Sequence, residues 1–150
     1  MIIGVLSDTH GLLRPEVLAA LEGCDMILHG GDINKQSVLD RLEQVAPVRV
    51  VRGNNDKDWA EHLPYSLDFK LDDLRVFMTH KKKDLPEDLT PYDLVILGHT
   101  HKYSESRIGA TTVLNPGCCG PRRPDQPITM AIVSVSGKTL EITKIDIPHR

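Results

Sequence analysis

Side chains that commonly bind metal ions follow five apolar segments of this sequence, each at the point where a strand would end. Five of the seven histidines lie there, together with aspartate and asparagine residues. Because open α/β sheets bind ligands at the carboxyl ends of their strands, we expect the five motifs to converge on one metal site. The motifs are Ser7-Asp8-Thr9-His10, His29-Gly30-Gly31-Asp32, Gly53-Asn54-Asn55-Asp56, His80 and Gly98-His99-Thr100-His101.

The types of these side chains narrow the choice of metal. Neutral imidazole binds Zn, Mn, Fe, Ni and Co, whereas carboxylate and carboxamide oxygens favour Mn and Fe. Since the motifs hold no cysteine, a structural zinc site is not expected. If seven of these aspartate, asparagine and histidine side chains bind metal, they are too many for one tetrahedral ion. Seven ligands suit two divalent ions that share a carboxylate, the arrangement used in phosphoryl displacement. We therefore predict two divalent ions per chain, with Mn favoured and Ni, Zn, Fe or Co as alternatives.

The elements that must position these motifs alternate in the first half of the chain. We predict strands over Ile2–Leu6, Met26–Leu28 and Val48–Arg52. Between them we predict one helix over Pro15–Glu22 and another that Asn34 caps and that runs to about Val45. Such a series implies parallel strands joined by right-handed crossovers. An extended segment through residues 8–10 would turn Asp8 and His10 to the same side, toward one ion.

The second half of the chain consists mainly of predicted strands with short links. Gly109-Ala110 and Ser136-Gly137 are predicted as hairpin turns, and Pro116–Pro127 as an ordered loop. So many strands for so few helices predict two packed mixed sheets with helices on the outer faces, within one domain that spans residues 1–150. The predicted strands are Ser66–Leu71, Arg75–Thr79, Leu94–Leu97, Tyr103–Ile108, Thr111–Leu114, Thr129–Val135 and Thr139–Ile145.

Composition excludes several classes of protein. Lys+Arg number 18 and Asp+Glu 21, so neither a nucleic-acid nor a membrane-surface partner is expected. No apolar run reaches the roughly 18 residues of a membrane span, and the start of the chain lacks the basic region of a signal peptide. The odd number of cysteines, two of them adjacent, predicts reduced thiols and a cytoplasmic protein.

In their order along residues 8–101, the motifs resemble those of the calcineurin-like metallophosphoesterase superfamily: D-x-H, G-D, G-N-H-D/E, a lone His and G-H-x-H. The chain length and Asn115-Pro116-Gly117 resemble its small, single-domain YfcE-type branch. The resemblance implies a four-layer α-β-β-α sandwich, in agreement with the predicted elements. It also implies one ion held by Asp8, His10 and His101, a second held by Asn54, His80 and His99, and Asp32 shared between them.

The same resemblance assigns further roles and exposes two departures. Asn55 stands where the family has a histidine proposed to protonate the leaving group, and Asp56 is the acid that would orient that histidine. Lys81 stands where the family has glycine. From the residues alone, His29 either orients Asp32, meets substrate, supplies the missing proton or is satisfied by the backbone, and Lys81–Lys83 either steers anions or is a solvated turn. The expected substrate-binding residues are Asn115, Arg122 and Arg123.

These observations predict a phosphoesterase that uses in-line attack by a metal-bridging hydroxide. The charge of two divalent ions, two carboxylates and one hydroxide is matched by a phosphodiester monoanion, whereas a monoester dianion would over-neutralise it. The expected partner is thus a small phosphodiester, with a homo-oligomer left open. Two alternatives are a non-catalytic scaffold of the kind found in the retromer and a DNA-processing nuclease. The nuclease would need capping segments and a basic face, and neither is visible in the sequence.

Overall fold

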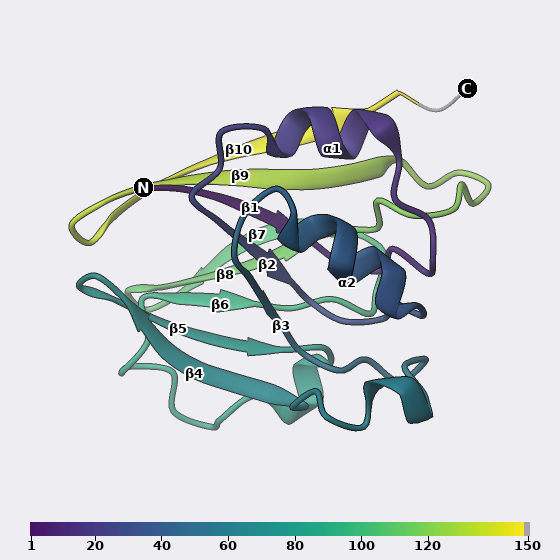
Figure 1. Ribbon diagram of the computed structural model, residues 1–150. Coiled ribbons are helices and arrows are strands. Elements are labelled where there is room, and N and C mark those ends of the chain that lie inside the picture. The colour runs from purple at the N-terminus through teal and green to yellow at the C-terminus, as the bar shows by residue number, and fades with distance from the viewer. Residues whose placement is uncertain (149–150) are drawn as a thin grey trace.

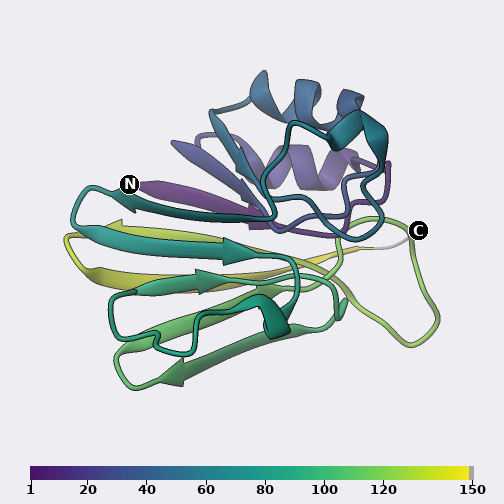
Figure 2. The same cartoon turned by 90° about the horizontal axis from the view of Figure 1, so that it is seen from below.

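Two five-stranded β-sheets packed face to face form the centre of the computed structural model, which describes residues 1–148 (Figures 1 and 2). The first sheet has the order β10-β9-β1-β2-β3 and the second the order β4-β5-β6-β8-β7. The first sheet comprises β1 (Ile2–Leu6), β2 (Met26–His29), β3 (Val48–Val50), β9 (Ile128–Ser136) and β10 (Thr139–Ile147). The second comprises β4 (Ser66–Leu71), β5 (Leu74–Thr79), β6 (Leu94–Ile96), β7 (Tyr103–Ile108) and β8 (Thr111–Pro116).

Both sheets are mixed, as predicted. Strands β1, β2 and β3 are parallel neighbours, and so are β5, β6 and β8, while β9, β10, β4 and β7 pair antiparallel. The carboxyl ends of β1, β2, β5 and β6 therefore lie along the same side of the molecule, on the right in Figure 1. The loops that follow these strands carry the predicted metal-binding motifs.

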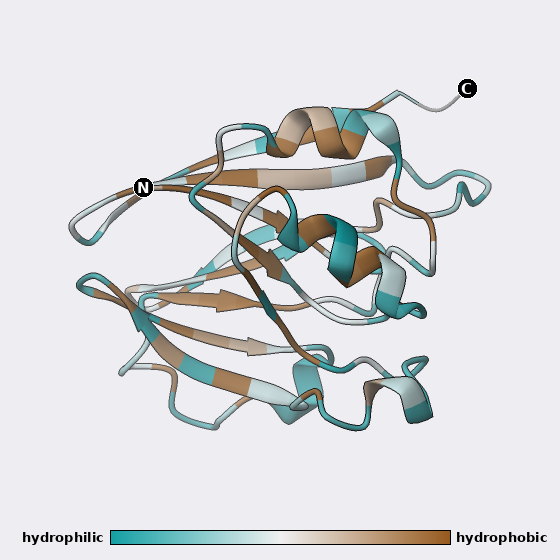
Figure 3. Cartoon of the chain, viewed as in Figure 1, coloured by the Kyte–Doolittle hydropathy of each residue, from teal (hydrophilic) through white to brown (hydrophobic). Residues whose placement is uncertain are grey.

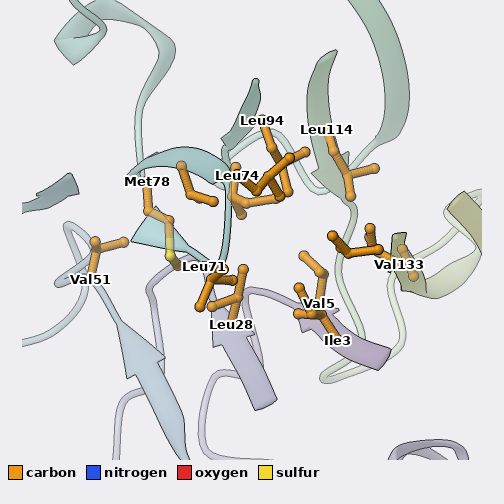
Figure 4. Packing of buried hydrophobic residues seen from close by; sticks show 14 residues of the cluster. Ile3, Val5, Leu28, Val51, Leu71, Leu74, Met78, Leu94, Leu114 and Val133 are labelled. Carbon is orange, nitrogen blue, oxygen red and sulfur yellow. The ribbon is translucent and has the colours of Figure 1, made fainter. Parts of the chain in front are cut away.

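The core between the sheets is built from the apolar residues of the central strands. In β1, Ile3 and Val5 point toward the second sheet, where they meet residues such as Leu94 (Figure 4). Leu6 of the same strand packs on the opposite face, toward the helices. A strand buried on both faces needs a continuous apolar run, which explains the sequence of β1. By contrast, β4 alternates between hydrophobic and hydrophilic residues, because one of its faces meets solvent (Figure 3).

Two helices, α1 (Pro15–Leu21) and α2 (Gln36–Glu43), cover the outer face of the first sheet (Figure 2). Proline stands at the start of α1, as predicted. The predicted cap of α2 is wrong: the helix starts at Gln36, and the capping position is held by Lys35 without a side-chain hydrogen bond. Asn34 instead has a left-handed backbone (φ +70°), and its N–H donates to Asp56.

The outer face of the second sheet is covered in a different way. A short 3-10 helix, η2 (Lys82–Asp84), and the segment that follows it place Leu89 and Tyr92 over Phe77 and Val95. Within residues 1–148 this fourth layer contains no α-helix, because the segment from η2 to β6 is short and interrupted by proline. The predicted fold class, with two mixed sheets and flanking layers, is confirmed.

The connections agree with prediction apart from small shifts. The first hairpin turns at Gly109-Ala110, between β7 and β8. The second turns one residue later than predicted, because Ser136 still pairs with Thr139 and Gly137 adopts φ +61°. A second 3-10 helix, η1 (Asp58–Ala60), lies between β3 and β4. In the described part of the chain, no helix combines the length and the apolar character needed to cross a membrane.

Candidate metal centre

Two buried carboxylates lie at the centre of the converging loops. Asp8 Oδ1 is 3.2 Å from His101 Nε2, 3.7 Å from His10 Nε2 and 4.0 Å from His80 Nε2. Asp32 Oδ2 is 3.2 Å from His80 Nε2 and 3.9 Å from His10 Nε2. The structure thus forms two groups that could each hold a cation, Asp8-His10-His101 and Asp8-Asp32-His80. Both carboxylates approach a histidine of each group.

The remaining predicted ligands complete the second group. The ring of His99 lies 5.2 Å from that of His80, measured between centres, and its Nδ1 is 3.1 Å from Asn54 Oδ1. The structure therefore brings together all seven residues predicted as ligands, although residues 8 and 101 are far apart in the sequence. His99 and Asn54 are exposed, whereas Asp8, Asp32 and His80 are buried.

Two buried polar atoms within this cluster have no hydrogen-bond partner, namely Asp8 Oδ1 and His80 Nε2. His80 Nδ1 lies 2.7 Å from the carbonyl oxygen of Gly30, which can only accept a hydrogen bond. The ring proton is therefore on Nδ1, and the lone pair of Nε2 faces the cluster. A buried carboxylate oxygen and a buried imidazole lone pair without donors are satisfied by a cation, so the residues fit divalent metal ions.

Neighbouring imidazoles and hydrogen-bond donors keep the two carboxylates ionised despite their burial. Burial alone would raise the pKa of Asp8, but the nearby imidazoles of His10 and His101 and the hydrogen bond from Ser7 outweigh it and hold that pKa far below its usual range. Burial of Asp32 is outweighed in the same way by His80 and by the N–H of Asn55, so its pKa is also lowered. Burial would lower the pKa of His80, yet the two carboxylates raise it. The cluster is thus suited to positive charge.

The ligand loops turn sharply instead of continuing the strands. Asp8, His10, Asp32, His99 and His101 all have positive φ, between +46° and +75°. The expectation of an extended segment through residues 8–10 is therefore wrong, although Asp8 and His10 do lie together. The physical reason is pairing between loops: Asp8 N donates to Gly31 O at 2.9 Å and His10 N to Asp32 O at 3.0 Å. Left-handed backbone is costly for such residues, and it is concentrated at the candidate site.

Two glycines allow the loops to approach so closely. A Cβ atom at Gly53 would overlap the backbone N and the carboxylate of Asp32. A Cβ atom at Gly98 would overlap Ser7 Oγ, and it would also meet the carbonyl oxygen of Gly30 at 2.9 Å. The glycines in G-N-N-D and G-H-T-H therefore serve packing between loops, which places Asn54 and His99 beside the buried carboxylates.

Asp56 differs from its predicted catalytic role. Its side chain is buried, and its two carboxylate oxygens accept hydrogen bonds from four backbone N–H groups at 2.8–2.9 Å. These bonds commit the carboxylate to the backbone, so it does not face the side chain of residue 55. Asp56 instead fixes the loop that carries Asp32. Its four donors are Gly53, Asp32, Ile33 and Asn34.

His29 is also displaced from the reacting centre. Its side chain is fully buried, Nδ1 accepts a hydrogen bond from Gly31 N at 3.1 Å, and Nε2 lies 3.0 Å from Thr9 Oγ1. Burial lowers the pKa of His29 to about 4, so the ring is neutral at pH 7. Because both nitrogens are engaged inside the protein, the interpretation of His29 as a source of protons for the leaving group is wrong. The ring ties together the loops of Asp8 and Asp32.

Asn55 contacts one of the carboxylates directly. Its backbone N donates to Asp32 Oδ1 at 2.8 Å, and its side-chain amide donates to Oδ2 at 3.1 Å. The residue is exposed and lies at the edge of the cluster. Asn55 therefore orients the carboxylate of Asp32 from the solvent side, a contact that the sequence does not predict.

The predicted substrate-binding residues divide between two places, with Asn115 in one and both arginines in the other. Asn115 is buried and bonds to Gly98 O, Thr100 Oγ1 and Gly117 N, so it holds the loop of His99, and its contact with substrate stays a prediction. Among the residues described, neither Arg122 nor Arg123 contacts a candidate ligand. Both line a separate surface pocket, and their contact with phosphate stays a prediction.

Sequence reasoning missed two supports of Asp8. Ser7 Oγ donates to Asp8 Oδ2 at 2.6 Å, and Cys118 Sγ donates to the carbonyl oxygen of Asp8 at 3.1 Å. Ser7 lies inside the first motif, next to Asp8, so its position in the sequence could have suggested this contact. Cys118 is 110 residues away, and no spacing in the sequence connects it with Asp8.

Comparison with known proteins gives consistent matches. A family model described as the calcineurin-like phosphoesterase superfamily domain matches residues 1–138. A Methanothermobacter thermautotrophicus protein named probable metallophosphoesterase is 32% identical over an alignment of 155 positions, gaps included, which covers 94% of this chain and 90% of the relative. The solved structure of an archaeal phosphodiesterase has a TM-score of 0.83 at 27% identity, covering 98% of this chain and 100% of that one. Vps29 of Entamoeba histolytica, solved with Zn²⁺, shares the fold with a TM-score of 0.76 at 21% identity and covers 97% and 99% of the two chains.

Proposed function

This chain belongs to the calcineurin-like phosphoesterase superfamily, and on that premise we propose that it is a phosphodiesterase that works with two divalent metal ions. The observation that carries the proposal is the pair of buried atoms without hydrogen-bond partners, Asp8 Oδ1 and His80 Nε2, which lie 4.0 Å apart. Both face a cluster of imidazole, carboxylate and carboxamide groups that the fold gathers from five loops. A merely structural cluster of polar groups would satisfy its buried atoms internally.

The number of candidate ligand side chains, seven, favours two bound ions over one. One ion is assigned to Asp8, His10 and His101 and the other to Asn54, His80 and His99, with Asp32 between them. The approach of Asp32 Oδ2 to both His10 and His80 supports its shared role. When bound, the two ions supply an acidified water for in-line attack on phosphorus and positive charge for the phosphate oxygens. Manganese as the ion and a cytoplasmic location belong to the same proposal.

The protein's own groups set the conditions for the reaction. Asp8 and Asp32 bring two negative charges, so the loaded centre suits a phosphodiester monoanion better than a monoester dianion. His99 and Asn54 are exposed and lie where substrate enters. Neither Asn55 nor His29 protonates the leaving group, because an amide has no acidic proton at neutral pH and the His29 ring is fully buried. The leaving group therefore departs unaided or takes its proton from water.

The proposal is tested by metal analysis coupled with an assay. Protein stripped with a chelator is reloaded with Mn, Zn, Ni, Fe or Co, and bound metal is counted while bis(p-nitrophenyl) phosphate and p-nitrophenyl phosphate are assayed. We expect two ions per chain and faster hydrolysis of the diester. His80→Ala should lose both properties, whereas His62→Ala, which changes an exposed histidine outside the cluster, should keep them.

The opposite result would favour the scaffold alternative. A chain that binds metal but hydrolyses neither ester, or that binds none of the five ions, would not be a phosphodiesterase of this kind. The fold shared with Vps29 does not decide between the two functions, because a fold alone carries no activity.

A further inference from the structure

A pocket of about 110 Å³ opens beside the candidate metal centre. Two of its lining residues, Asn54 and His80, are also predicted ligands, so the pocket and the centre share a wall. An organic group attached to a phosphate at the centre would therefore extend into this pocket. Its aromatic and cationic lining residues are Arg52, Tyr65, Lys81 and Lys83.

The pocket is held together by hydrogen bonds between segments that are distant in the sequence. Arg52 N donates to the carbonyl oxygen of Pro64 at 2.7 Å, which joins the end of β3 to the chain before β4. Thr79 Oγ1 donates to the carbonyl oxygen of Tyr65 at 3.2 Å, which joins the same chain to the end of β5. The backbone that carries the lining residues is thus fixed by the fold.

Tyr65 is an exposed aromatic residue in this wall. Its relative exposure is 63%, the highest among the large hydrophobic residues described as exposed. The Arg52 guanidinium carbon lies 5.2 Å from the ring centre, within the range of a cation–π contact. Arg52 is itself held, because Nε and Nη2 donate to the carbonyl oxygens of Asp56 and Lys57. The guanidinium thus lies over one face of the Tyr65 ring, and most of the tyrosine side chain stays open to solvent.

The pocket is also positively charged, although the whole chain has a formal net charge of −3. Arg52, Lys81 and Lys83 are opposed by the single carboxylate of Asp84 among the lining residues, which leaves a formal charge of +2 before any metal is added. Planar aromatic surface beside clustered cations is the combination that binds bases and their phosphates.

We propose that this pocket binds the organic arm of the substrate and that the arm carries a planar ring together with negative charge, as a nucleoside phosphate does. The proposal rests on the phosphodiesterase function and assigns its substrate class. Tyr65 and Arg52 receive the ring, and Lys81 and Lys83 receive the additional phosphate. Arg52, Tyr65, Lys81 and Lys83 are then specificity residues outside the metal ligand set.

The ring-binding part is tested by calorimetric titration of the metal-loaded protein. Thymidine 5′-monophosphate and methyl phosphate carry the same phosphate but differ in the arm. Since stacking of a base on an aromatic side chain typically changes affinity by about 5- to 100-fold, we expect the nucleotide to bind at least about fivefold more tightly. Tyr65→Ala should remove this difference, and Tyr65→Phe should retain it. Equal affinity of the two ligands for the parent protein would overturn the proposal.

The charge-binding part uses two neighbouring lysines as a matched pair. Lys83 lines the pocket, whereas Lys82 is exposed beside it and does not. For thymidine 3′,5′-bisphosphate, Lys83→Gln should weaken binding about three- to tenfold, and Lys82→Gln should leave it within about twofold. Equal losses in the two variants would mean general attraction by the turn and would refute a lysine site in the pocket.

These titrations separate the pocket from the proposed activity. If the centre is not a phosphate site, methyl phosphate and the nucleotide both fail to bind in a metal-dependent manner. If only the pocket assignment is wrong, both ligands bind and the diester is hydrolysed, but the arm and Tyr65 make no difference to affinity.

Discussion

The candidate metal centre has two parts that differ in how they are held. The floor consists of Asp8, Asp32 and His80, which are at most 3% exposed. The rim consists of His10, Asn54, His99 and His101, which are exposed or half-buried. Floor residues are bonded to the backbone of neighbouring loops, whereas His99 and Asn54 in the rim bond to each other by their side chains. The fold therefore sets the geometry of the floor, while the rim is free to adjust to metal and substrate.

This difference separates stability from activity. Asp56 and His29 fix the loop of Asp32 through buried hydrogen bonds, so the floor belongs to the folded core as much as to the site. Changes in the floor or its supports should alter folding, metal content and turnover together. Changes in the rim should alter turnover and leave the free energy of unfolding almost unchanged.

The largest effect is expected at the floor itself. Asp32→Ala should remove at least one metal ion and lower kcat/KM by about 10³-fold or more, since loss of a metal removes several kcal/mol of charge stabilisation. The measurement is metal content by mass spectrometry together with hydrolysis of an aryl diester. Two ions per chain and normal turnover in this variant would rule out a shared Asp32.

The support of the floor is tested by Asp56→Ala. The change leaves four backbone N–H groups of the Gly53 and Asp32 loops without their acceptor, so the free energy of unfolding should fall by about 3–5 kcal/mol. Urea unfolding in the presence of a chelator measures this loss without a contribution from metal. Asp56→Asn, which keeps one acceptor oxygen, should lose less. A stable Asp56→Ala protein without turnover would instead return Asp56 to a direct catalytic role.

The pH dependence of unfolding probes the second support, His29. Burial lowers its pKa to about 4 in the folded protein from 6.5 when exposed, so the unfolded chain binds the extra proton first. Its stabilisation is complete above about pH 6.5 and is lost as the pH falls toward 4, by about 3 kcal/mol. His29→Gln should be less stable at pH 7 and lose less on acidification, measured by urea unfolding without metal. Parallel pH profiles of the two proteins would contradict the assignment.

The smallest effect is expected at the edge of the centre, where Asn55→His adds an imidazole. The backbone bond from residue 55 to Asp32 remains, so folding should be almost unchanged. General acid catalysis typically raises a rate by roughly 10²–10⁴-fold. Asn55→His should regain part of this rate increase for diesters with alkyl leaving groups and little of it for those that release p-nitrophenolate. A series of diesters with leaving groups of increasing pKa measures this on both proteins. If the parent enzyme is insensitive to the leaving group, another residue already supplies the proton.

The sequence predicted the strands well, and it predicted which side chains converge, because both depend on local pattern. The apolar run of β1 and the histidines after β5 and β6 are visible without a structure. The role of Asp56 could not be predicted, because the sequence pattern around an acidic residue next to Asn55 is the same whether its side chain faces substrate or backbone amides. The left-handed backbone of Asp8 and His10 was missed for a related reason: it follows from pairing with the Gly31–Asp32 loop. The pocket at Tyr65 requires β3, β4 and β5 to be placed in space first.

The thiol of Cys118 is a native probe for local opening of the floor. The side chain is 4% exposed and donates to the carbonyl oxygen of Asp8, and burial raises the pKa of the thiol, so it is inert while the floor is closed. Labelling by a thiol reagent then requires local opening, and the labelling rate measures how often the hydrogen bond between Cys118 and the backbone of Asp8 opens. The labelling rate of Cys118, measured with and without metal, would show how much metal binding slows local opening of the centre, with no probe residue introduced into the chain.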